Sequence, residues 1–266
     1  MKPVLGTDAA TVDRYRSSGY TVLRTAFDTA GLSAEVDEAF AEGLRGDTPS
    51  NSGPGNTFRY VPMMNGRTPN SLALLRALAE PAGQLLGRQP LPTRAKGTCY
   101  QGSTRWHRDS ELPVDSVAFI VYLEPLTAAT GALQVIPGSH HQHYPSPLDS
   151  HPPNDFAAEV LVTEPGDIIA MDEHLLHSSV GGDRRRQWRV DFIVDPTSAD
   201  DEAATRAYFQ GILPPGWDGG YDVDRYPSYD ALWRHPDERW SMRLAQLGVF
   251  ELAEAQESAA RRGRRA

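Results

Sequence analysis

The chain has 266 residues, a formal net charge of −9 and a single cysteine, Cys99. This length is enough for one domain with a large core. The acidic balance argues against a general nucleic-acid binder, which normally presents a basic face, and one cysteine excludes a disulfide within the chain.

Residues 1–7 lack the apolar core of a signal peptide. The longest apolar run, residues 117–123, is too short to span a bilayer. We therefore expect a soluble, cytoplasmic protein whose partner is a small-molecule substrate, with no nucleic acid and no membrane. The sequence leaves the oligomeric state unknown.

The N-terminal third reads as helices with one strand. Apolar spacing predicts helices over residues 8–17, 33–45 and 70–87, with Ser33 as the N-cap of the second. Residues 20–24 are rich in strand-forming side chains. Gly, Pro, Ser and Asn dominate the start of the stretch 46–65, and we expect this stretch to form a lid over the substrate.

From residue 92 onward the pattern changes to short strands that end in Gly or Pro turns. These strands are expected over residues 94–101, 116–123, 132–136, 159–163, 168–171 and 188–194. Residues 140–158 contain four histidines and several prolines, and they are expected to form an irregular, solvated insertion. The many Gly and Pro residues, 23 and 21, fit frequent tight turns.

Short strands separated by such turns are typical of a double-sheet jelly roll. We therefore predict a mainly β protein with flanking helices, folded as a double-stranded β-helix (a jelly roll, or cupin-like barrel). A single domain is expected over residues 1–266. Its parts are the N-terminal helices in 8–87, a jelly-roll core over about 92–195 and a helical C-terminal extension over 201–266.

A candidate metal site starts at His107 and Asp109. The two residues are two positions apart, so on an extended strand both side chains leave the same face. An imidazole and a carboxylate can take adjacent positions on one metal ion, and Fe(II) accepts this mixed set. A third ligand is available further along the chain, where His174 and His177 are both candidates.

Two histidines and one carboxylate on one face of an octahedral ion are typical of non-haem Fe(II) oxygenases. A 2-oxo acid would fill two of the three open positions and leave one for O2. Its far carboxylate then needs a cation, and arginine gives a planar, permanently charged grip. Arg189, twelve residues after His177, is the predicted anchor, and Arg186 in the preceding turn is the alternative.

The chain resembles the phytanoyl-CoA dioxygenase-like (PhyH) family of Fe(II)/2-oxoglutarate-dependent oxygenases. Three segments carry the likeness: Trp-His-x-Asp at 106–109, Gly-x-Leu-x-x-x-Pro-Gly-Ser-His at 131–140, and Pro-Gly-Asp at 165–167 followed by Leu-Leu-His-Ser-Ser at 175–179. The match covers residues 92–195 well and the N-terminal helices loosely. Ile120 and Tyr122 stand where relatives often have tryptophan.

The resemblance implies that His177, not His174, completes the metal site with His107 and Asp109. It also implies Ser179 as a helper of Arg189 at the 2-oxoglutarate carboxylate, and Fe(II), 2-oxoglutarate and O2 as cofactors. Related halogenases have a small residue in place of the carboxylate ligand, so Asp109 argues against halogenation.

The expected function is therefore a dioxygenase that hydroxylates or oxidatively cyclises a C–H bond of a small molecule, with release of succinate and CO2. A bacterial natural-product intermediate, as in antibiotic biosynthesis, is the expected substrate. Two other functions stay open. One is a jelly-roll hydrolase or isomerase that uses Zn or Mn without O2 and has no need of Arg189. The other is a non-enzymatic binding module.

Overall fold

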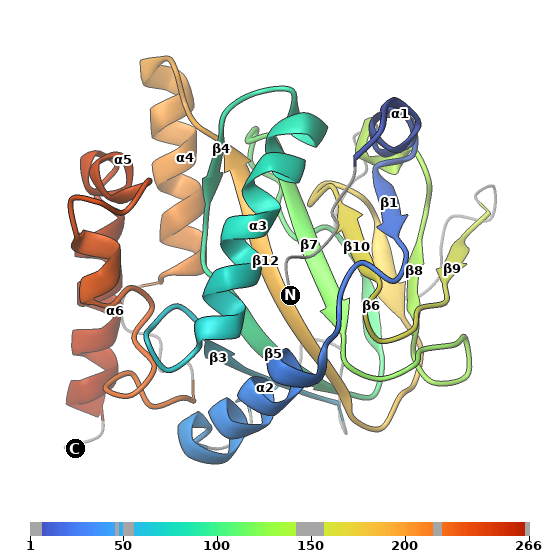
Figure 1. Ribbon diagram of the computed structural model, residues 1–266, viewed down its shortest axis with the longest axis horizontal. Helices are drawn as coiled ribbons and strands as arrows, with labels where there is room; N and C mark the ends of the chain where they lie inside the picture. The colour runs from blue at the N-terminus through green and yellow to red at the C-terminus, as the bar shows by residue number, and fades with distance from the viewer. Residues whose placement is uncertain (1–6, 46–47, 50–55, 142–156, 215–219, 264–266) are drawn as a thin grey trace.

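Two antiparallel sheets form the centre of the molecule, and helices cover the outer face of the larger one (Figure 1). The computed structural model describes residues 7–45, 48–49, 56–141, 157–214 and 220–263. The larger sheet has the strand order β1-β10-β7-β12-β5-β3-β2, with β4 also paired to β12, and the smaller sheet has the order β6-β11-β8-β9. This is the expected double-stranded β-helix.

The strands are β1 Tyr20–Leu23, β2 Thr48–Pro49, β3 Thr57–Pro62, β4 Pro90–Pro92, β5 Lys96–Gln101, β6 Thr104–His107, β7 Ser116–Tyr122, β8 Leu133–Val135, β9 Glu159–Leu161, β10 Ile168–Met171, β11 His177–Ser179 and β12 Arg185–Val194. The helices are α1 Ala9–Ser18, α2 Ala30–Gly43, α3 Pro69–Leu86, α4 Ala199–Ile212, α5 Ser241–Gln246 and α6 Val249–Gly263. Short 3-10 helices occupy Ser139–His141 and Ala231–Arg234.

The central strand β7 is apolar on both faces because each face packs against a different layer. Alternate side chains leave a strand on opposite sides. Val117, Phe119 and Val121 belong to the core shared with the helices, whereas Ile120 and Tyr122 belong to the core between the two sheets. The continuous apolar run in the sequence therefore reflects burial on both sides of the sheet.

Strand β12 divides its side chains by type. Trp188 and Phe192 face the helices with the apolar core, while Arg185, Gln187 and Arg189 line a cavity inside the barrel. This alternation places basic side chains inside the barrel on a strand that also supplies the helix-facing core.

Helix α3 lies across the larger sheet (Figure 1), and Ser71 in its first turn joins the two layers. The Ser71 hydroxyl accepts a 2.7 Å hydrogen bond from the indole of Trp188 and donates one to the carbonyl of Met63, also at 2.7 Å. Glu35 of α2 accepts from the backbone N–H groups of Asn70 and Ser71 at the same helix end. The carboxylate thus satisfies amides that lack partners within α3.

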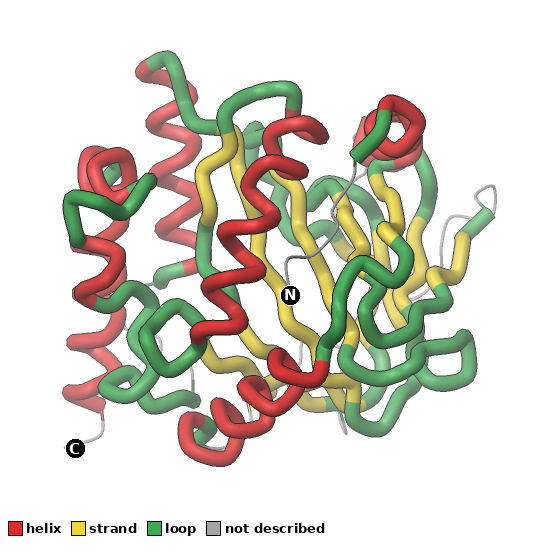
Figure 2. The backbone as a smooth tube through the Cα atoms, in the orientation of Figure 1, coloured by secondary structure: helices red, strands yellow, loops and turns green. Residues whose placement is uncertain are grey.

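The C-terminal helices gather at one end of the larger sheet (Figure 2). Their buried side chains, among them Tyr208, Phe209, Leu244 and Phe250, join the core that lies between α3 and the sheet. Helices α4, α5 and α6 fall within residues 201–266 or overlap the start of this region.

Several element boundaries differ from the prediction. Helix α2 starts at Ala30, and Ser33 lies inside its first turn instead of capping it, with its N–H bonded to the carbonyl of Thr29. Strand β12 starts at Arg185, three residues earlier than expected. The three consecutive arginines 184–186 resemble a turn in sequence, yet two of them, Arg185 and Arg186, pair with β5, opposite Tyr100 and Cys99.

The expected lid over 46–65 is in part a strand. Residues 57–62 form β3, which pairs along its whole length with β5. Pairing with β5, about 40 residues further along the chain, makes residues 57–62 a strand although loop-forming residues precede them in the sequence. The remaining lid residues 46–47 and 50–55, and residues 142–156 of the expected insertion, lie outside the described residues.

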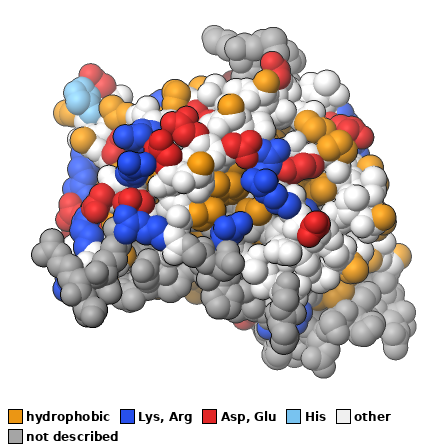
Figure 3. Space-filling model, turned by 90° about the horizontal axis from the view of Figure 1, so that it is seen from below, with side chains coloured by type: hydrophobic (Ala, Val, Ile, Leu, Met, Phe, Trp, Pro, Cys, Tyr) orange, Lys and Arg blue, Asp and Glu red, His pale blue; other side chains and the backbone are white. Residues whose placement is uncertain are grey.

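Basic and acidic side chains are interspersed around a central apolar area on the face shown in Figure 3. Exposed ion pairs such as Arg67 with Glu42, at 3.3 Å, are common in the described part of the chain. Such pairs contribute little to stability individually. Within the described residues, no helix has the length and apolar character needed to cross a membrane.

The contact between Glu35 and α3 predicts a stability effect. The two oxygens of Glu35 each accept from one backbone amide, and Glu35→Gln replaces one of these oxygens with an NH2 group. The substitution also removes a negative charge from a helix N-terminus. We expect a loss of about 1 kcal/mol in the free energy of unfolding, measured by chemical denaturation. Glu38→Gln, at an exposed position of the same helix, serves as the control. Equal stability of the two variants would contradict the capping role.

Candidate metal centre

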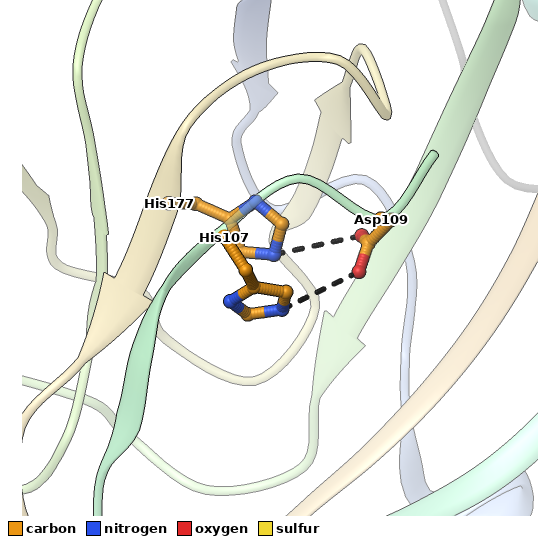
Figure 4. Close-up of side chains that lie close together, drawn as sticks. All are labelled: His107, Asp109 and His177. Carbon is orange, nitrogen blue, oxygen red and sulfur yellow. Dashed lines mark ion pairs between the residues drawn. The ribbon is translucent and has the colours of Figure 1, made fainter. Parts of the chain in front are cut away.

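Three potential metal ligands meet where β6 and β11 pair at the open end of the barrel. His177 lies directly opposite His107 in this antiparallel pair, so the two imidazole rings stand side by side with centroids 4.2 Å apart. The chain turns after His107 and brings Asp109 in front of both rings (Figure 4). One nitrogen or oxygen from each of the three side chains lies within 4.8 Å of the others.

Both histidines are held in the tautomer that metal binding requires. The Nδ1 atom of His107 lies 2.7 Å from the carbonyl of Arg105, and that of His177 lies 2.9 Å from the carbonyl of Leu175. A carbonyl only accepts, so each Nδ1 carries the proton. Each Nε2 then presents a lone pair to the centre, 3.5 Å from a carboxylate oxygen of Asp109.

The surroundings set the charge of each group. Burial lowers the pKa of His177 to about 4, so this ring is neutral at pH 7. Burial also opposes the charge on Asp109 and His107, but neighbouring charges outweigh it: Arg189 holds the pKa of Asp109 well below its usual range. The hydrogen bond and charge of Asp109 in turn raise the pKa of His107 above the ordinary histidine value. Two imidazole lone pairs facing a carboxylate are a donor set for a divalent cation.

His174, the alternative third ligand, has both ring nitrogens occupied elsewhere. Its Nδ1 lies 2.9 Å from Asp172 and its Nε2 lies 2.7 Å from the carbonyl of Leu112. The hydrogen bond with Asp172 raises the pKa of His174 to about 9, so the ring is protonated at neutral pH. The geometry therefore favours His177 over His174.

A small cavity, open to solvent on one side, lies beside the three ligands. Its lining is mixed, with apolar, hydroxyl and cationic side chains: Tyr100, Thr104, His107, Asp109, Ile120, Tyr122, Leu133, His177, Ser179, Arg185, Gln187 and Arg189. The His177 side chain is only 6% exposed and that of His107 is 43% exposed, so the approach from solvent passes His107.

Arg189 and Ser179 both line this cavity, but their contacts differ. The guanidinium of Arg189 donates to the carboxylates of Asp109, Glu173 and Asp191 at 2.7, 3.1 and 2.5 Å. The Ser179 hydroxyl lies 2.8 Å from that of Thr104. Arg189 thus sits at the metal end of the cavity with its nitrogens engaged, and Ser179 sits with Thr104 on the opposite sheet.

Arg185 is the cavity cation that the sequence interpretation missed. It lies four residues before Arg189 on the same face of β12, about 13 Å along the strand at 3.3 Å per residue. Arg185 is buried and donates to the carbonyls of Gly131 and Gly102, while its Nε has no partner. Side chains alternate between the two faces of a strand, so Arg185 and Arg189 share a face. A predicted strand that began at residue 185 would therefore have identified Arg185.

Arg186, the alternative anchor, points away from the cavity. On the outer face of β12 its guanidinium bonds to Glu124 at 2.5 Å and to Asp37 at 2.6 Å. One residue along a strand reverses the side-chain direction, so Arg185 and Arg186 have opposite surroundings.

Residues 6–187 match the family Phytanoyl-CoA dioxygenase (PhyH). The chain belongs to this family. Membership confirms the expected enzyme class, an Fe(II)/2-oxoglutarate-dependent oxidoreductase that uses O2. The matched segment contains all three candidate ligands and Arg185, whereas Arg189 and Asp191 lie beyond its end.

Solved structures with the same fold come from several such enzymes. The epimerase SnoN from nogalamycin biosynthesis has 19% sequence identity and a TM-score of 0.58, over 71% of this chain and 85% of its own. The carbocyclase SnoK, also from nogalamycin biosynthesis, has 15% identity and a TM-score of 0.59, over 75% and 91%.

EvdO2 from Micromonospora carbonacea var. aurantiaca, solved with 2-oxoglutarate, has 15% identity and a TM-score of 0.53, over 76% of this chain and 96% of its own. At these identities the comparisons establish the shared fold. No curated protein sequence is significantly similar to the chain.

We expect His177 and His174 to differ in how their loss affects metal binding. His177→Ala removes one Nε2 ligand, so we expect Mn(II) affinity to fall by at least ~100-fold. His174→Gln leaves the three ligands in place, so affinity stays within about threefold of the wild type. Equilibrium dialysis of the purified proteins measures both. Loss of binding in the His174 variant alone would reverse the assignment.

The pKa values also predict how many protons the metal displaces. Between pH 5 and 6, His177 is already neutral because its pKa is about 4, whereas His107, with its raised pKa, is protonated. Metal binding then releases one proton, and affinity falls about tenfold for each pH unit lowered in this range. Calorimetry in buffers of different ionisation enthalpy counts the protons. Release of two protons would contradict the lowered pKa of His177.

Proposed function

We propose that this enzyme inserts oxygen into, or oxidatively cyclises, a C–H bond of a small molecule, with Fe(II) held by His107, Asp109 and His177. This proposal rests on a cavity that has these three ligands at one end and a buried arginine, Arg185, at the other. A 2-oxo dicarboxylic acid needs these two features at the two ends of one cavity.

The donor chemistry supports iron at the three ligands. Two neutral nitrogens and one carboxylate oxygen form the facial set of non-haem Fe(II) oxygenases. The Nδ1 hydrogen bonds to the carbonyls of Arg105 and Leu175 fix both rings in the metal-free protein. The two side chains therefore lose little further conformational freedom when a metal binds.

Arg185, in place of the expected Arg189, is the proposed anchor for the far carboxylate of 2-oxoglutarate. Its present partners are carbonyl oxygens, and its Nε is buried without an acceptor. A carboxylate would satisfy this donor and neutralise the buried charge. Ser179 and Thr104 add hydroxyl donors from the opposite sheet. Arg189 already faces three carboxylates, which favours Arg185 for this role.

The chain's own groups perform the positioning. Bound Fe(II) would supply electrons and open coordination positions for O2 while 2-oxoglutarate is converted to succinate and CO2. Arg185 and Ser179 hold the far end of the co-substrate, and the buried walls formed by Ile120, Tyr122 and Leu133 exclude water. In a hydroxylation, one oxygen atom of O2 ends in succinate and the other in the new hydroxyl group of the substrate; in an oxidative cyclisation, the second oxygen atom leaves as water.

Two observations support a substrate class: the accessibility of the site and the ligands of similar solved structures. The open side at His107 admits a separate small molecule next to the metal position. SnoN, solved with Fe3+, alpha ketoglutarate and nogalamycin RO, shows this fold with a natural product bound. We therefore propose a natural-product intermediate as the substrate. A Zn or Mn hydrolase in the same barrel would leave the buried Arg185 without a role.

Anaerobic absorption spectroscopy tests the proposal. Fe(II) and 2-oxoglutarate added to the wild type should give a visible metal-to-ligand charge-transfer band, and His177→Ala should abolish it. Arg185→Gln should raise the Kd of 2-oxoglutarate about 10- to 100-fold, the loss of a charge-assisted contact. Arg184→Gln, at the exposed residue that immediately precedes β12, is the matched control.

Absence of the band in the wild type, together with bound Zn in the purified protein, would contradict the oxygenase proposal in favour of the hydrolase. If the band forms normally in the Arg185 variant, while an Arg189→Lys protein keeps its Mn(II) affinity and loses 2-oxoglutarate binding, the anchor is Arg189. Succinate release in the presence of candidate natural products then identifies the substrate.

A further inference from the structure

A buried ionic network lies directly behind the metal position. Arg189 is 6% exposed, and its three donor nitrogens each bond to a different carboxylate. Nη1 donates to Oδ2 of Asp109, Nη2 to Oε1 of Glu173 and Nε to Oδ1 of Asp191. One planar guanidinium therefore fixes three acidic side chains in a single arrangement.

Glu173 holds Asp109 in a second way, through the backbone. Its carbonyl accepts the N–H of Asp109 at 2.9 Å and that of Ser110 at 3.3 Å. Its buried side chain accepts from Arg189 and, at 2.8 Å, from the hydroxyl of Tyr208 on α4. The main chain and the side chain of Asp109 are thus both tied to Glu173, and α4 supports this residue from outside the barrel.

The network treats the two oxygens of Asp109 differently. Each oxygen lies 3.5 Å from one imidazole Nε2, Oδ1 from that of His107 and Oδ2 from that of His177. Only Oδ2 also accepts the 2.7 Å charge-assisted bond from Arg189. A carboxylate that binds a metal through both oxygens would use one more coordination position. An oxygen already held by a guanidinium is a weaker metal ligand.

We propose that Arg189 is a positioning residue: held by Glu173 and Asp191, it occupies Oδ2 and makes Asp109 a one-oxygen ligand through Oδ1. This keeps three positions on the metal free for 2-oxoglutarate and O2. The assignment rests on the proposed function, because it assumes a metal at His107, Asp109 and His177. Tyr208, which lies beyond the residues matched by the family, extends the support to the C-terminal region.

The acidic groups around Arg189 require its positive charge in the folded protein. Three carboxylates surround it, and Lys96 adds a further cation 3.6 Å from Asp191. Removing the positive charge would leave buried acids unpaired, a strongly destabilising change. Arg189→Lys keeps the charge and loses the planar fork, so it is the informative substitution.

Mn(II) affinity without any co-substrate is the first measurement. We expect Arg189→Lys to weaken Mn(II) binding about 10-fold or more, as is typical when a group that orients a metal ligand is lost. Arg186→Lys is the matched control: the same substitution on the same strand, in an arginine that pairs with Glu124 and Asp37 on the outer face. It should bind Mn(II) as the wild type does.

A crystal structure of the Mn(II)-loaded wild type is the second measurement. Oδ1 of Asp109 should bind the metal while Oδ2 keeps its bond to Arg189. Ligation through Oδ2 or through both oxygens would overturn the proposal. So would an Arg189→Lys protein with unchanged Mn(II) affinity and weakened 2-oxoglutarate binding, since that result makes Arg189 a co-substrate ligand.

Tyr208→Phe keeps the proposal testable if Arg189→Lys does not fold. Loss of the hydroxyl that supports Glu173 should weaken Mn(II) binding a few-fold. Tyr15→Phe is its control, because it removes an equally buried hydroxyl that donates to the carbonyl of Ser116 instead. Equal effects of the two tyrosine variants would overturn the role of the network. A wild type that binds no Mn(II) would overturn the metal centre itself, and the proposal with it.

Discussion

The register between β6 and β11 is the constraint on which the site depends. His177 pairs directly with His107 across these two strands, and each strand is short. A slip of one residue would turn one imidazole to the other face of the sheet and separate the pair. The alignment of the small sheet therefore sets the distance between two candidate metal ligands.

Local sequence patterns predicted the parts of this molecule that depend on local interactions. The apolar run of β7, the Gly and Pro turns, and the proximity of His107 and Asp109 were readable because each needs only a few neighbouring residues. The shared strand face expected for His107 and Asp109 was wrong, because β6 ends at His107 and a turn brings Asp109 to the two rings. The jelly roll and the family followed from their order. Of the ligands, His107 and Asp109 came from spacing, while the choice of His177 over His174 needed the family resemblance. In the structure, the contacts of His174 with Asp172 and Leu112 supply the physical reason for that choice.

What escaped prediction depends on partners far away in the chain. Strand β3 is defined by β5, and the start of β12 at Arg185 is defined by Tyr100 opposite it. The missed start concealed Arg185 as a cavity residue. Two of the three partners of Arg189 were equally invisible, since Asp109 and Glu173 approach it from other parts of the chain, whereas Asp191 lies two residues along the same strand. That residues 1–266 form a single domain stays a prediction.

The link from Tyr208 to Glu173 has a consequence for the order in which the enzyme matures. The chain leaves the ribosome N-terminus first, and Tyr208 follows the last candidate metal ligand, His177, by thirty-one residues. Until α4 has emerged and docked, the acid that holds Asp109 lacks one of its hydrogen-bond donors. Under the proposed function, the residues that would hold iron therefore reach their full set of hydrogen bonds only in the finished fold.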